Sequence, residues 1–281
     1  MALVPSTLDR HMPNPSRPLA FVLAATEHGT MIVNRFDRCA TSPNVVIGVG
    51  FQLLERAVYD PGEVEVLLEL LNLRRQHYGD GVIAVDCGAN IGVHTVEWAK
   101  RMTGWGVVVA FEAQERLYYA LAGNITINNC FNARVIHAAV ASRSGTMKMP
   151  ALNYLAAASF GSLELKKRVD PEYIGQTIDY DDDKMIDVRT VNLDSFNFPR
   201  LDLLKIDVEG MEIETLAGAA ACIEANHPIV FVETLKSDPA QLRAWLEARD
   251  YVVLGAGKNF LAVHKTDKCL AQIKFAPAAA A

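Results

Sequence analysis

The fold is decided by residues 82–95, which read Val82-Ile83-Ala84-Val85-Asp86-Cys87-Gly88-Ala89-Asn90-Ile91-Gly92-Val93-His94-Thr95. The aliphatic start predicts a strand that is buried on both faces, as in parallel sheets, and a helical pattern follows Gly92. Gly88 and Gly92 let the backbone turn sharply and approach a ligand closely, while the amides of the following helix point into the crevice. The stretch therefore predicts a nucleotide-like ligand at a strand-to-helix turn.

An acid at the end of the next strand strengthens this prediction. Glu112 ends the aliphatic run Val107–Phe111, where a carboxylate can accept hydrogen bonds from both hydroxyls of a ribose. The loop differs from the dinucleotide fingerprint G-x-G-x-x-G, because Cys87–Gly92 lacks the required glycines and Asp86 would repel a pyrophosphate. Asp86 suits a cationic ligand instead. S-adenosylmethionine, an adenosine that carries an amino acid and a sulfonium, therefore fits better, with Asn90 binding its amino-acid end.

Short aliphatic runs alternate with helical patterns over much of the chain. Such runs are typical of a parallel sheet covered on both faces, so the sequence predicts a doubly wound, mostly parallel α/β fold. The expected parallel strands are 82–85, 107–111, 135–138, 203–206 and 229–232. Tyr251–Leu254 and Asn259–Val263, separated by a glycine-containing turn, predict an antiparallel hairpin at one edge.

The chain is expected to hold one main domain, over residues 59–275, that begins with a helix from Pro61 to about Gln76. Before it, 1–18 holds four prolines and few apolar anchors, which predicts a flexible arm. The segment 19–58 reads as short strands with turns, a small β-rich extension.

Two further segments break the regular pattern. Residues 142–187 fit no single period and are rich in Tyr and Phe, which predicts a lid or an insertion over the site. The low-complexity residues 276–281 are expected to be disordered.

The composition excludes several classes of protein. Of the 281 residues, 51% are hydrophobic and 21% are charged, which is typical of a globular chain and excludes a disordered one. The formal net charge of -6 leaves no cationic field for phosphate backbones, so a nucleic acid is not an expected partner. No apolar run reaches the roughly 18 residues that a membrane span needs. The five cysteines stand singly, which indicates reduced thiols and predicts a cytoplasmic protein.

A second acidic cluster follows the buried strand expected at 203–206. The sequence there reads Leu201-Asp202-Leu203-Leu204-Lys205-Ile206-Asp207-Val208-Glu209-Gly210-Met211-Glu212. Asp207 and Glu209 alternate at the strand end, so we expect their side chains to point to opposite sides, with Asp207 facing the crevice. Both are candidates for binding or catalysis, whereas Glu212 has the simpler interpretation of an acid in the first turn of a helix. Glu233 ends the next strand and should lie on the same rim.

These motifs, taken in order, form a specific pattern. Besides residues 85–92 and 205–212, it includes Phe111-Glu112, His137-Ala138-Ala139-Val140 and Asn192-Leu193-Asp194-Ser195, followed by Pro228 and Glu233. The pattern resembles the FkbM-type S-adenosylmethionine-dependent methyltransferases, within the wider Rossmann-like class, over roughly Tyr59 to Glu233. The resemblance implies a seven-stranded sheet and methyl transfer, in most members, to a hydroxyl oxygen of a sugar, polyketide or similar small molecule.

The resemblance also implies roles by position. Asp86, Gly88, Asn90 and Gly92 would hold the amino-acid end of the cofactor, Glu112 its ribose, and Ala138-Ala139 would line its adenine. Two residues depart from the family pattern, since Ala113 stands where Pro is common and His94 where an aromatic residue is common. The second departure places an ionisable group near the methyl-transfer region. His94 is therefore a candidate catalytic residue, beside the simpler interpretation of a histidine on a helix face.

An alcohol stays protonated near neutral pH, so methyl transfer to it calls for a positioned base. The candidates are, in order, Asp207, Glu209, His94 and Glu233. We assign no metal ligand, although two or three carboxylates on one rim could bind Mg²⁺ and polarise the hydroxyl.

Two other functions stay open. One is an NAD(P)-dependent oxidoreductase, which the missing glycine of the fingerprint and Asp86 disfavour. The other is a non-catalytic methyltransferase-like module that binds a partner protein through residues 19–51. The sequence leaves the acceptor molecule and the oligomeric state unassigned.

Overall fold

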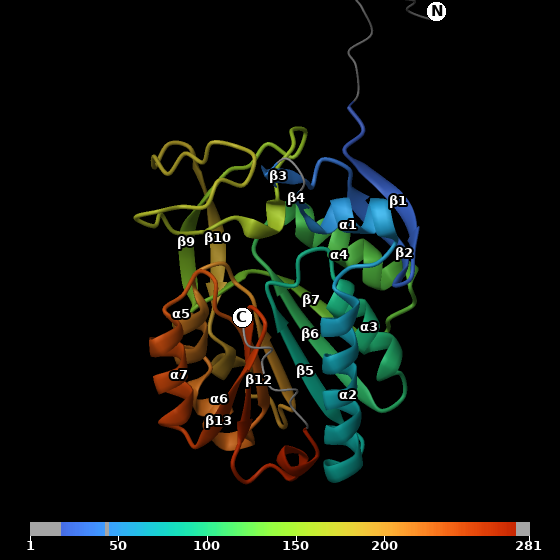
Figure 1. Cartoon of the computed structure of the whole chain (residues 1–281), viewed down its shortest axis with the longest axis vertical. Coiled ribbons are helices and arrows are strands. Elements are labelled where there is room, and N and C mark those ends of the chain that lie inside the picture. Colours follow the sequence, from blue (N-terminus) through green and yellow to red (C-terminus); the bar gives the residue numbers. More distant parts are fainter. Residues whose placement is uncertain (1–17, 43–44, 274–281) are drawn as a thin grey trace, which may run out of the picture.

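The computed structural model describes residues 18–42 and 45–273, whose arrangement is shown in Figure 1. The expected arm, apart from Pro18, and the expected tail at 276–281 lie outside the described residues. Within the described ranges, none of the helices combines the length and the apolar character that crossing a membrane requires.

A seven-stranded sheet forms the centre of the molecule, in the order β13-β14-β12-β11-β5-β6-β7 (Figure 1). Five strands run parallel to one another: β5 (Val82–Cys87), β6 (Gly106–Glu112), β7 (Ala133–His137), β11 (Leu203–Ile206) and β12 (Ile229–Glu233). The predicted hairpin is formed by β13 (Tyr251–Ala256) and β14 (Asn259–His264), and β14 runs antiparallel to β12. The predicted fold class is confirmed. The strand order reverses between β5 and β11, which is the point where such sheets bind ligands.

Helices cover both faces of the sheet because neighbouring residues of a strand point to opposite sides. Ala84 packs in one apolar cluster with Leu67 and Trp98, whereas its neighbour Val85 packs in a second cluster with Leu216. The first face carries α2 (Pro61–Tyr78), α3 (Val93–Arg101) and α4 (Glu115–Ile127). The second carries α5 (Glu212–Ala217), α6 (Ala220–Asn226) and α7 (Pro239–Glu247).

The extension (residues 19–58) forms two strand pairs and one helix that the sequence did not indicate. The antiparallel pairs are β1 (Phe21–Thr26) with β2 (Gly29–Asn34) and β3 (Cys39–Ser42) with β4 (Val45–Ile47), and the helix is α1 (Val49–Arg56). Asn124 of α4 attaches the extension to the domain. Its side chain accepts from the backbone N–H of Ile32 (2.5 Å) and donates to the carbonyl oxygen of Ile91 in the glycine loop (2.8 Å).

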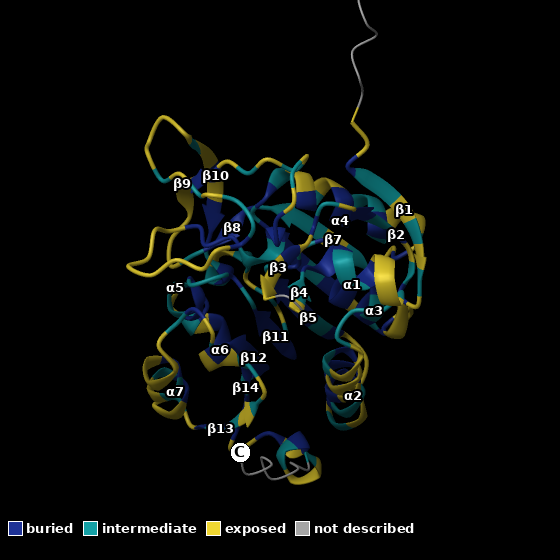
Figure 2. Cartoon of the chain, turned by 45° about the horizontal axis from the view of Figure 1, so that its top comes forward, coloured by how far each residue is buried: buried dark blue, intermediate teal, exposed yellow. Residues whose placement is uncertain are grey.

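The insertion (residues 142–187) contains β9 (Gly145–Pro150), the short 3-10 helix η1 (Phe160–Ser162) and the start of β10 (Met185–Val191). β10 lies between β9 and β8 (Ala139–Val140) in a separate three-stranded sheet. Much of the rest of the insertion runs as loops beside the extension, and the outer loops are exposed (Figure 2). Two more short 3-10 helices are η2 (Leu193–Phe196) and η3 (Lys268–Gln272).

Asp37, between β2 and β3, joins the extension to the insertion. One of its carboxylate oxygens accepts from the N–H of Gly50 at the start of α1 (2.8 Å), and the other accepts from the N–H of Phe160 in η1 (3.0 Å). Burial raises the pKa of Asp37 to about 6, although these backbone hydrogen bonds act in the opposite direction. The extension and the insertion thus form a joined roof over the carboxyl ends of the parallel strands.

Candidate active site

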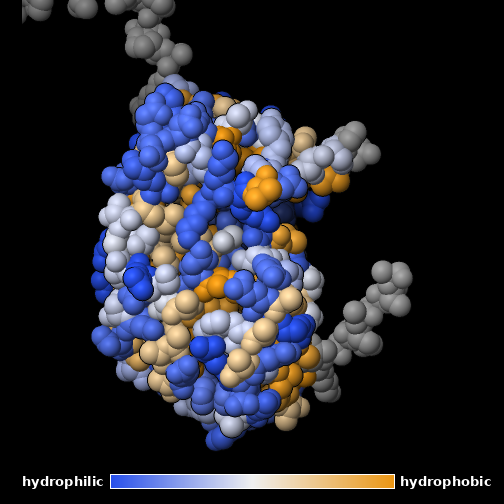
Figure 3. Space-filling model, turned by 90° about the vertical axis from the view of Figure 1, so that its left-hand side faces the viewer, coloured by the Kyte–Doolittle hydropathy of each residue, from blue (hydrophilic) through white to orange (hydrophobic). Residues whose placement is uncertain are grey.

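A cavity of about 340 Å³ lies between the carboxyl ends of the parallel strands and the roof. The loop Gly88–Gly92 after β5, Glu112 at the end of β6 and Asp207 after β11 line it from below, while Gln52 of the extension and Ser162 of the insertion line it from the roof. Figure 3 shows the surface hollowed between the upper part of the molecule, which holds the insertion, and the lower part. The volume is that of a site for a small molecule or a cofactor.

The glycine loop takes its shape from residues in the left-handed region. The φ angles are 78° for Gly88, 53° for Asn90 and 90° for Gly92, and all three residues line the cavity. A Cβ on Gly88 would lie 1.7 Å from the backbone oxygen of Asp207, so this position requires glycine. The loop after β5 and the end of β11 therefore form one wall of the cavity.

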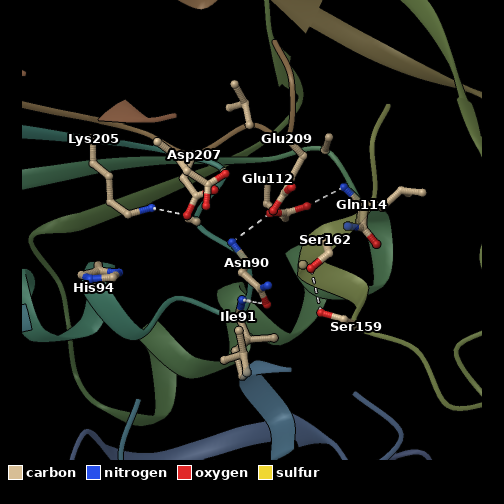
Figure 4. Close-up of a pocket in the computed structure, with 18 of the residues that line it drawn as sticks. Asn90, Ile91, His94, Glu112, Gln114, Ser159, Ser162, Lys205, Asp207 and Glu209 are labelled. Atoms are coloured by element: carbon tan, nitrogen blue, oxygen red, sulfur yellow. Dashed lines mark hydrogen bonds and ion pairs between the residues drawn. The ribbon is translucent and has the colours of Figure 1, made fainter. Parts of the chain in front are cut away.

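Glu112 presents its carboxylate to the cavity in a fixed orientation. Its Oε2 accepts from the backbone N–H of Asn90 (2.8 Å) and its Oε1 from that of Gln114 (2.7 Å), as Figure 4 shows. Burial raises the pKa of Glu112 to about 7, although the two backbone hydrogen bonds lower it. Each carboxylate oxygen keeps a second lone pair. The group can therefore accept two further hydrogen bonds, such as those of a ribose diol.

Asp86 lies beneath the loop and is fully buried. Its Oδ2 accepts from the hydroxyl of Thr95 (2.8 Å), and its Oδ1 lies 3.7 Å from Nζ of Lys205. Lys205 lines the cavity, and the charges of Asp207 and Asp86 raise the pKa of its ammonium against the lowering effect of burial. Among the described residues that line the cavity, Lys205 is present and Asp86 is not, and direct contact of Asp86 with a cationic ligand stays a prediction.

Ala138 and Ala139 line the cavity beside Phe111 and Ala113, near the end of β6. All four side chains lack polar atoms, and the two alanines are nearly fully buried. This part of the wall offers an apolar surface with small side chains, which suits a flat ring.

Asp207, Glu209 and Glu233 all line the cavity, and one oxygen of each lies within 4.8 Å of the others. The expectation that only one of Asp207 and Glu209 would face the crevice was wrong. The strand β11 ends at Ile206 and Glu209 takes a left-handed φ of 55°, so the alternation of a pleated strand no longer applies. Glu212 begins α5 as expected, and its carboxylate accepts from two backbone N–H groups of this turn (3.1 Å each).

Each acid of this cluster has a lysine close by. The distance between the ammonium nitrogen and the nearest carboxylate oxygen is 3.4 Å for Lys205–Asp207, 2.5 Å for Lys236–Glu209 and 3.6 Å for Lys258–Glu233. Burial and the charge of Asp207 raise the pKa of Glu233 to about 7, and they raise that of Glu209 well above its ordinary value. The charges of Lys236 and Lys258 act in the opposite direction and lower the pKa values of Glu209 and Glu233 in part.

His94 lies in the first turn of α3 and lines the cavity, with 8% of its side chain exposed. Its Nε2 lies 3.3 Å from Oε1 of Glu63 on α2. The rings of Tyr59 and Trp98 flank it, with centroids 6.5 Å and 5.8 Å away. Figure 4 shows the imidazole on the same side of the cavity as Lys205, away from Gln114. The contacts with Glu63, Tyr59 and Trp98 therefore fix the orientation of the His94 imidazole at the wall of the cavity.

Several lining residues were not predicted from the sequence. Gln114 donates from Nε2 to the carbonyl oxygen of Phe160 (2.7 Å) and accepts at Oε1 from the hydroxyl of Tyr154 (2.8 Å), which joins the end of β6 to the insertion. No local pattern marks such residues, because they reach the cavity only through tertiary packing. Lys205 could have been found, since a lysine inside a buried strand is rare unless it is paired.

Residues 86–253, more than half of the chain, match the family model described as the methyltransferase FkbM domain. The chain belongs to the FkbM methyltransferase family. Among curated proteins, methyltransferase sdnD of Sordaria araneosa is 27% identical to this FkbM chain over 187 residues, which cover 58% of this chain and 70% of that protein. The family confirms the resemblance seen in the sequence and sets aside the oxidoreductase alternative.

Two solved structures are similar to this FkbM chain at low sequence identity. The crystal structure of methyltransferase FkbM from Methylobacillus flagellatus KT is 16% identical with a TM-score of 0.44, and the match covers 66% of this chain and 43% of that one. The chain thus spans less than half the length of that structure. The structure of magnesium protoporphyrin IX methyltransferase ChlM from Synechocystis PCC 6803, with bound SAM, is 10% identical with a TM-score of 0.44, and the match covers 78% and 86% of the two chains.

S-adenosylmethionine is the cofactor of the FkbM methyltransferases, and the cavity of this member fits it. Glu112 offers free lone pairs to a ribose diol, and the apolar wall at Ala138 and Ala139 offers a place for the adenine. Within the described residues, the buried Oε2 of Glu233 has no hydrogen-bond partner, so part of the carboxylate cluster is unsatisfied in the free protein. A cationic sulfonium in the cavity would be stabilised by these acids.

Proposed function

We propose that this FkbM methyltransferase transfers a methyl group from S-adenosylmethionine to a hydroxyl oxygen of a small-molecule or glycan acceptor. One observation carries the proposal. A single cavity is lined both by Glu112, with its ribose-compatible carboxylate, and by the carboxylates of Asp207, Glu209 and Glu233. Methyl transfer to a hydroxyl needs both a held cofactor and polar groups that handle the charge and the proton of the acceptor.

S-adenosylmethionine supplies a methyl group that is electrophilic because it is bound to a positively charged sulfur. The acceptor oxygen attacks the methyl carbon in line with the carbon–sulfur bond. The new oxygen–carbon bond forms as the carbon–sulfur bond breaks, its electron pair stays on sulfur, and the hydroxyl proton passes to a base of the protein. The residues of the cavity therefore have to position the acceptor and accept one proton.

Asp207 is the acid of the cluster best placed to act on the reacting groups. Its side chain is 25% exposed, against 18% for Glu209 and 5% for Glu233, and it adjoins the glycine loop. We expect Asp207→Asn to keep the fold and to lower turnover by roughly 100-fold, because the carboxylate helps to position the acceptor beside the methyl carbon. The matched control Glu214→Gln, on the exposed side of α5, should keep normal turnover. Unchanged activity of Asp207→Asn would remove this residue from the mechanism.

The function is tested by asking which ligand stabilises the protein. We expect S-adenosylhomocysteine to raise the melting temperature and NAD⁺ to leave it unchanged, because a ligand that binds only the native state stabilises it. No shift with S-adenosylhomocysteine would favour the non-catalytic binding module.

The carboxylate cluster also allows a test for a metal ion. We expect methyl transfer to survive EDTA, because Lys205, Lys236 and Lys258 already balance the charge of the acids. Activity that is lost in EDTA and restored by Mg²⁺ would instead assign Asp207, Glu209 and Glu233 as metal ligands.

A further inference from the structure

The carboxylate of Glu63, which the sequence analysis did not single out, lies against the imidazole of His94. Glu63 lies in the first turn of α2, and 15% of its side chain is exposed. Its Oε1 lies 3.3 Å from Nε2 of His94, and its Oε2 accepts from the side-chain amide of Asn259 in β14 (2.9 Å). Both oxygens of Glu63 are thus in use, so its carboxylate cannot turn freely away from the imidazole.

This contact decides which nitrogen of His94 carries the proton. Burial raises the pKa of Glu63, but the close contact with His94 and the charge of that residue outweigh it and bring the pKa to about 2. An ionised carboxylate repels a nitrogen lone pair and attracts an N–H, so Nε2, which lies 3.3 Å from it without forming a well-aligned hydrogen bond, is the nitrogen that carries hydrogen. In the neutral imidazole Nδ1 is then left with a free lone pair. In the described part of the chain the His94 side chain makes no hydrogen bond with either nitrogen, and its imidazole lines the cavity.

We propose that Nδ1 of His94 is the base that takes the hydroxyl proton of the acceptor, and that Glu63 is the positioning residue that makes this nitrogen available. This inference rests on the proposed methyl transfer to oxygen. In the step, the acceptor O–H bond breaks and its electron pair forms the bond to the methyl carbon. The carbon–sulfur pair stays on sulfur, and the proton moves to Nδ1.

The charge balance favours His94 over the three acids. Each of Asp207, Glu209 and Glu233 lies near a lysine, and protonation of Asp207 would leave the buried ammonium of Lys205 without its nearest partner charge. The reaction removes the positive charge of the sulfonium from the cavity and produces one proton. If the imidazole accepts that proton, a positive charge remains beside the cavity and faces the ionised carboxylate of Glu63.

Other ionisable groups surround the pair. Tyr59 and Asp60 precede α2, Lys205 and Asp207 lie at the end of β11, and Lys258 lies in the turn between β13 and β14. The positive charges of the two lysines offset the negative charges of the two aspartates around the Glu63–His94 pair. Glu63 is the carboxylate of this environment that lies against the imidazole.

The tautomer can be read without knowing the acceptor. In protein labelled with ¹⁵N at histidine, the chain's seven histidines give separate imidazole signals, and the signals that disappear in His94→Phe belong to His94. We expect neutral His94 to carry its proton on Nε2 in the wild type, and Glu63→Ala to give a mixture of the two tautomers. Glu65→Ala, an exposed neighbour on the same helix turn, should leave the signals unchanged. A proton on Nδ1 in the wild type would overturn the proposal.

Kinetics test the role of the two residues. With labelled S-adenosylmethionine at saturating concentration and an acceptor-containing cell extract, we expect His94→Phe to lower kcat by roughly 100-fold or more. The acidic limb of its pH profile should also disappear, because saturation removes the effect of Glu112 on cofactor binding. Glu63→Gln should lower kcat by about tenfold or more without changing KM for S-adenosylmethionine, whereas Glu65→Gln should behave as the wild type. In both active-site variants the Kd for S-adenosylhomocysteine should stay within about threefold of the wild-type value.

The outcomes separate this inference from the function on which it rests. If His94→Phe transfers methyl groups at a rate within threefold of the wild type, His94 is not the base, although methyl transfer stands. If His94→Phe fails to fold, Glu63→Gln decides through kcat and the pH–rate profile. If the wild-type protein transfers no methyl group to any component of the extract, the proposed function fails. The contact between Glu63 and His94 is then tested only by the ¹⁵N measurement of the His94 tautomer.

Discussion

Acidification should weaken the binding of S-adenosylhomocysteine, because Glu112 must be ionised to accept hydrogen bonds from a ribose. Burial raises the pKa of this carboxyl to about 7, so in the free protein its protonated fraction grows as the pH falls through that value. If only the ionised form binds, the apparent Kd is multiplied by 1 + 10^(7 − pH). The factor is about 1.1 at pH 8, 2 at pH 7 and 11 at pH 6, so Kd should rise about tenfold from pH 8 to pH 6, or about 1.4 kcal/mol.

Calorimetric titration of the wild type, Glu112→Gln and the surface control Glu224→Gln checks this prediction. At pH 8 Glu112→Gln should bind roughly 10- to 100-fold more weakly, because hydrogen bonds to a charged group contribute about 1.5–3 kcal/mol, and its Kd should change little with pH. Its amide would also face a backbone N–H of Asn90 or Gln114, so its melting temperature has to be measured in parallel. A wild-type Kd that is constant from pH 6 to pH 8, or a Glu112→Gln variant with the wild-type slope, would refute the reasoning.

Three further substitutions test the structure around the cavity. Gly88→Ala should unfold the protein or destabilise it by about 3 kcal/mol or more, because the new Cβ would lie 1.7 Å from a backbone oxygen. The control Gly62→Ala should be tolerated, because the space around Gly62 is free. A stable Gly88→Ala protein would contradict the loop geometry. Asp37 has a folded pKa of about 6, above its unfolded value of 3.8, so its contribution to stability is present at low pH and is lost as the pH rises through 6. Relative to Asp37→Asn, the wild type should therefore lose about 1.4 kcal/mol in unfolding free energy between pH 5 and pH 7.5, and a difference that does not change with pH would contradict this. Lys236→Met should speed hydrogen exchange in the insertion, because the ammonium of Lys236 joins Ser162 and Glu172 to Glu209. Exchange should be unchanged in the control Lys166→Met, which replaces an exposed lysine. Equal exchange in Lys236→Met and the wild type would show that Lys236 does not hold the roof.

The sequence predicted the sheet because its strands are buried on both faces. Val82–Val85 and Leu203–Ile206 are aliphatic, apart from Lys205, which is paired with buried or half-buried acids. The loop at Gly88 needs a conformation that only glycine adopts easily. These are local requirements, so a linear pattern records them. The resemblance to the methyltransferase family implied seven strands in the sheet, and the strand order was not predicted.

The roof of the cavity and the partners of the acids could not be predicted in the same way. Asp37 bonds to Gly50 and Phe160, and Phe160 lies 123 positions away in the chain. The alternation expected for Asp207 and Glu209 failed because β11 ends at Ile206, before both acids, and because Glu209 takes a left-handed φ. Glu63 had only the signal of an acid in the first turn of a helix, which is usually structural. The roles of these residues depend on contacts with residues far away in the chain, and a local sequence pattern does not record such contacts.

Identification of the methylated product tests the central proposal most directly. The protein is incubated with ¹³C-methyl-labelled S-adenosylmethionine and an extract of the source cell, and the labelled carbon is located by NMR and mass spectrometry. We expect the label in a small molecule or glycan as a methoxyl carbon, formed by the wild type and strongly reduced with Asp207→Asn. Label on nitrogen or carbon, or recovery of the label in protein or RNA, would contradict the account.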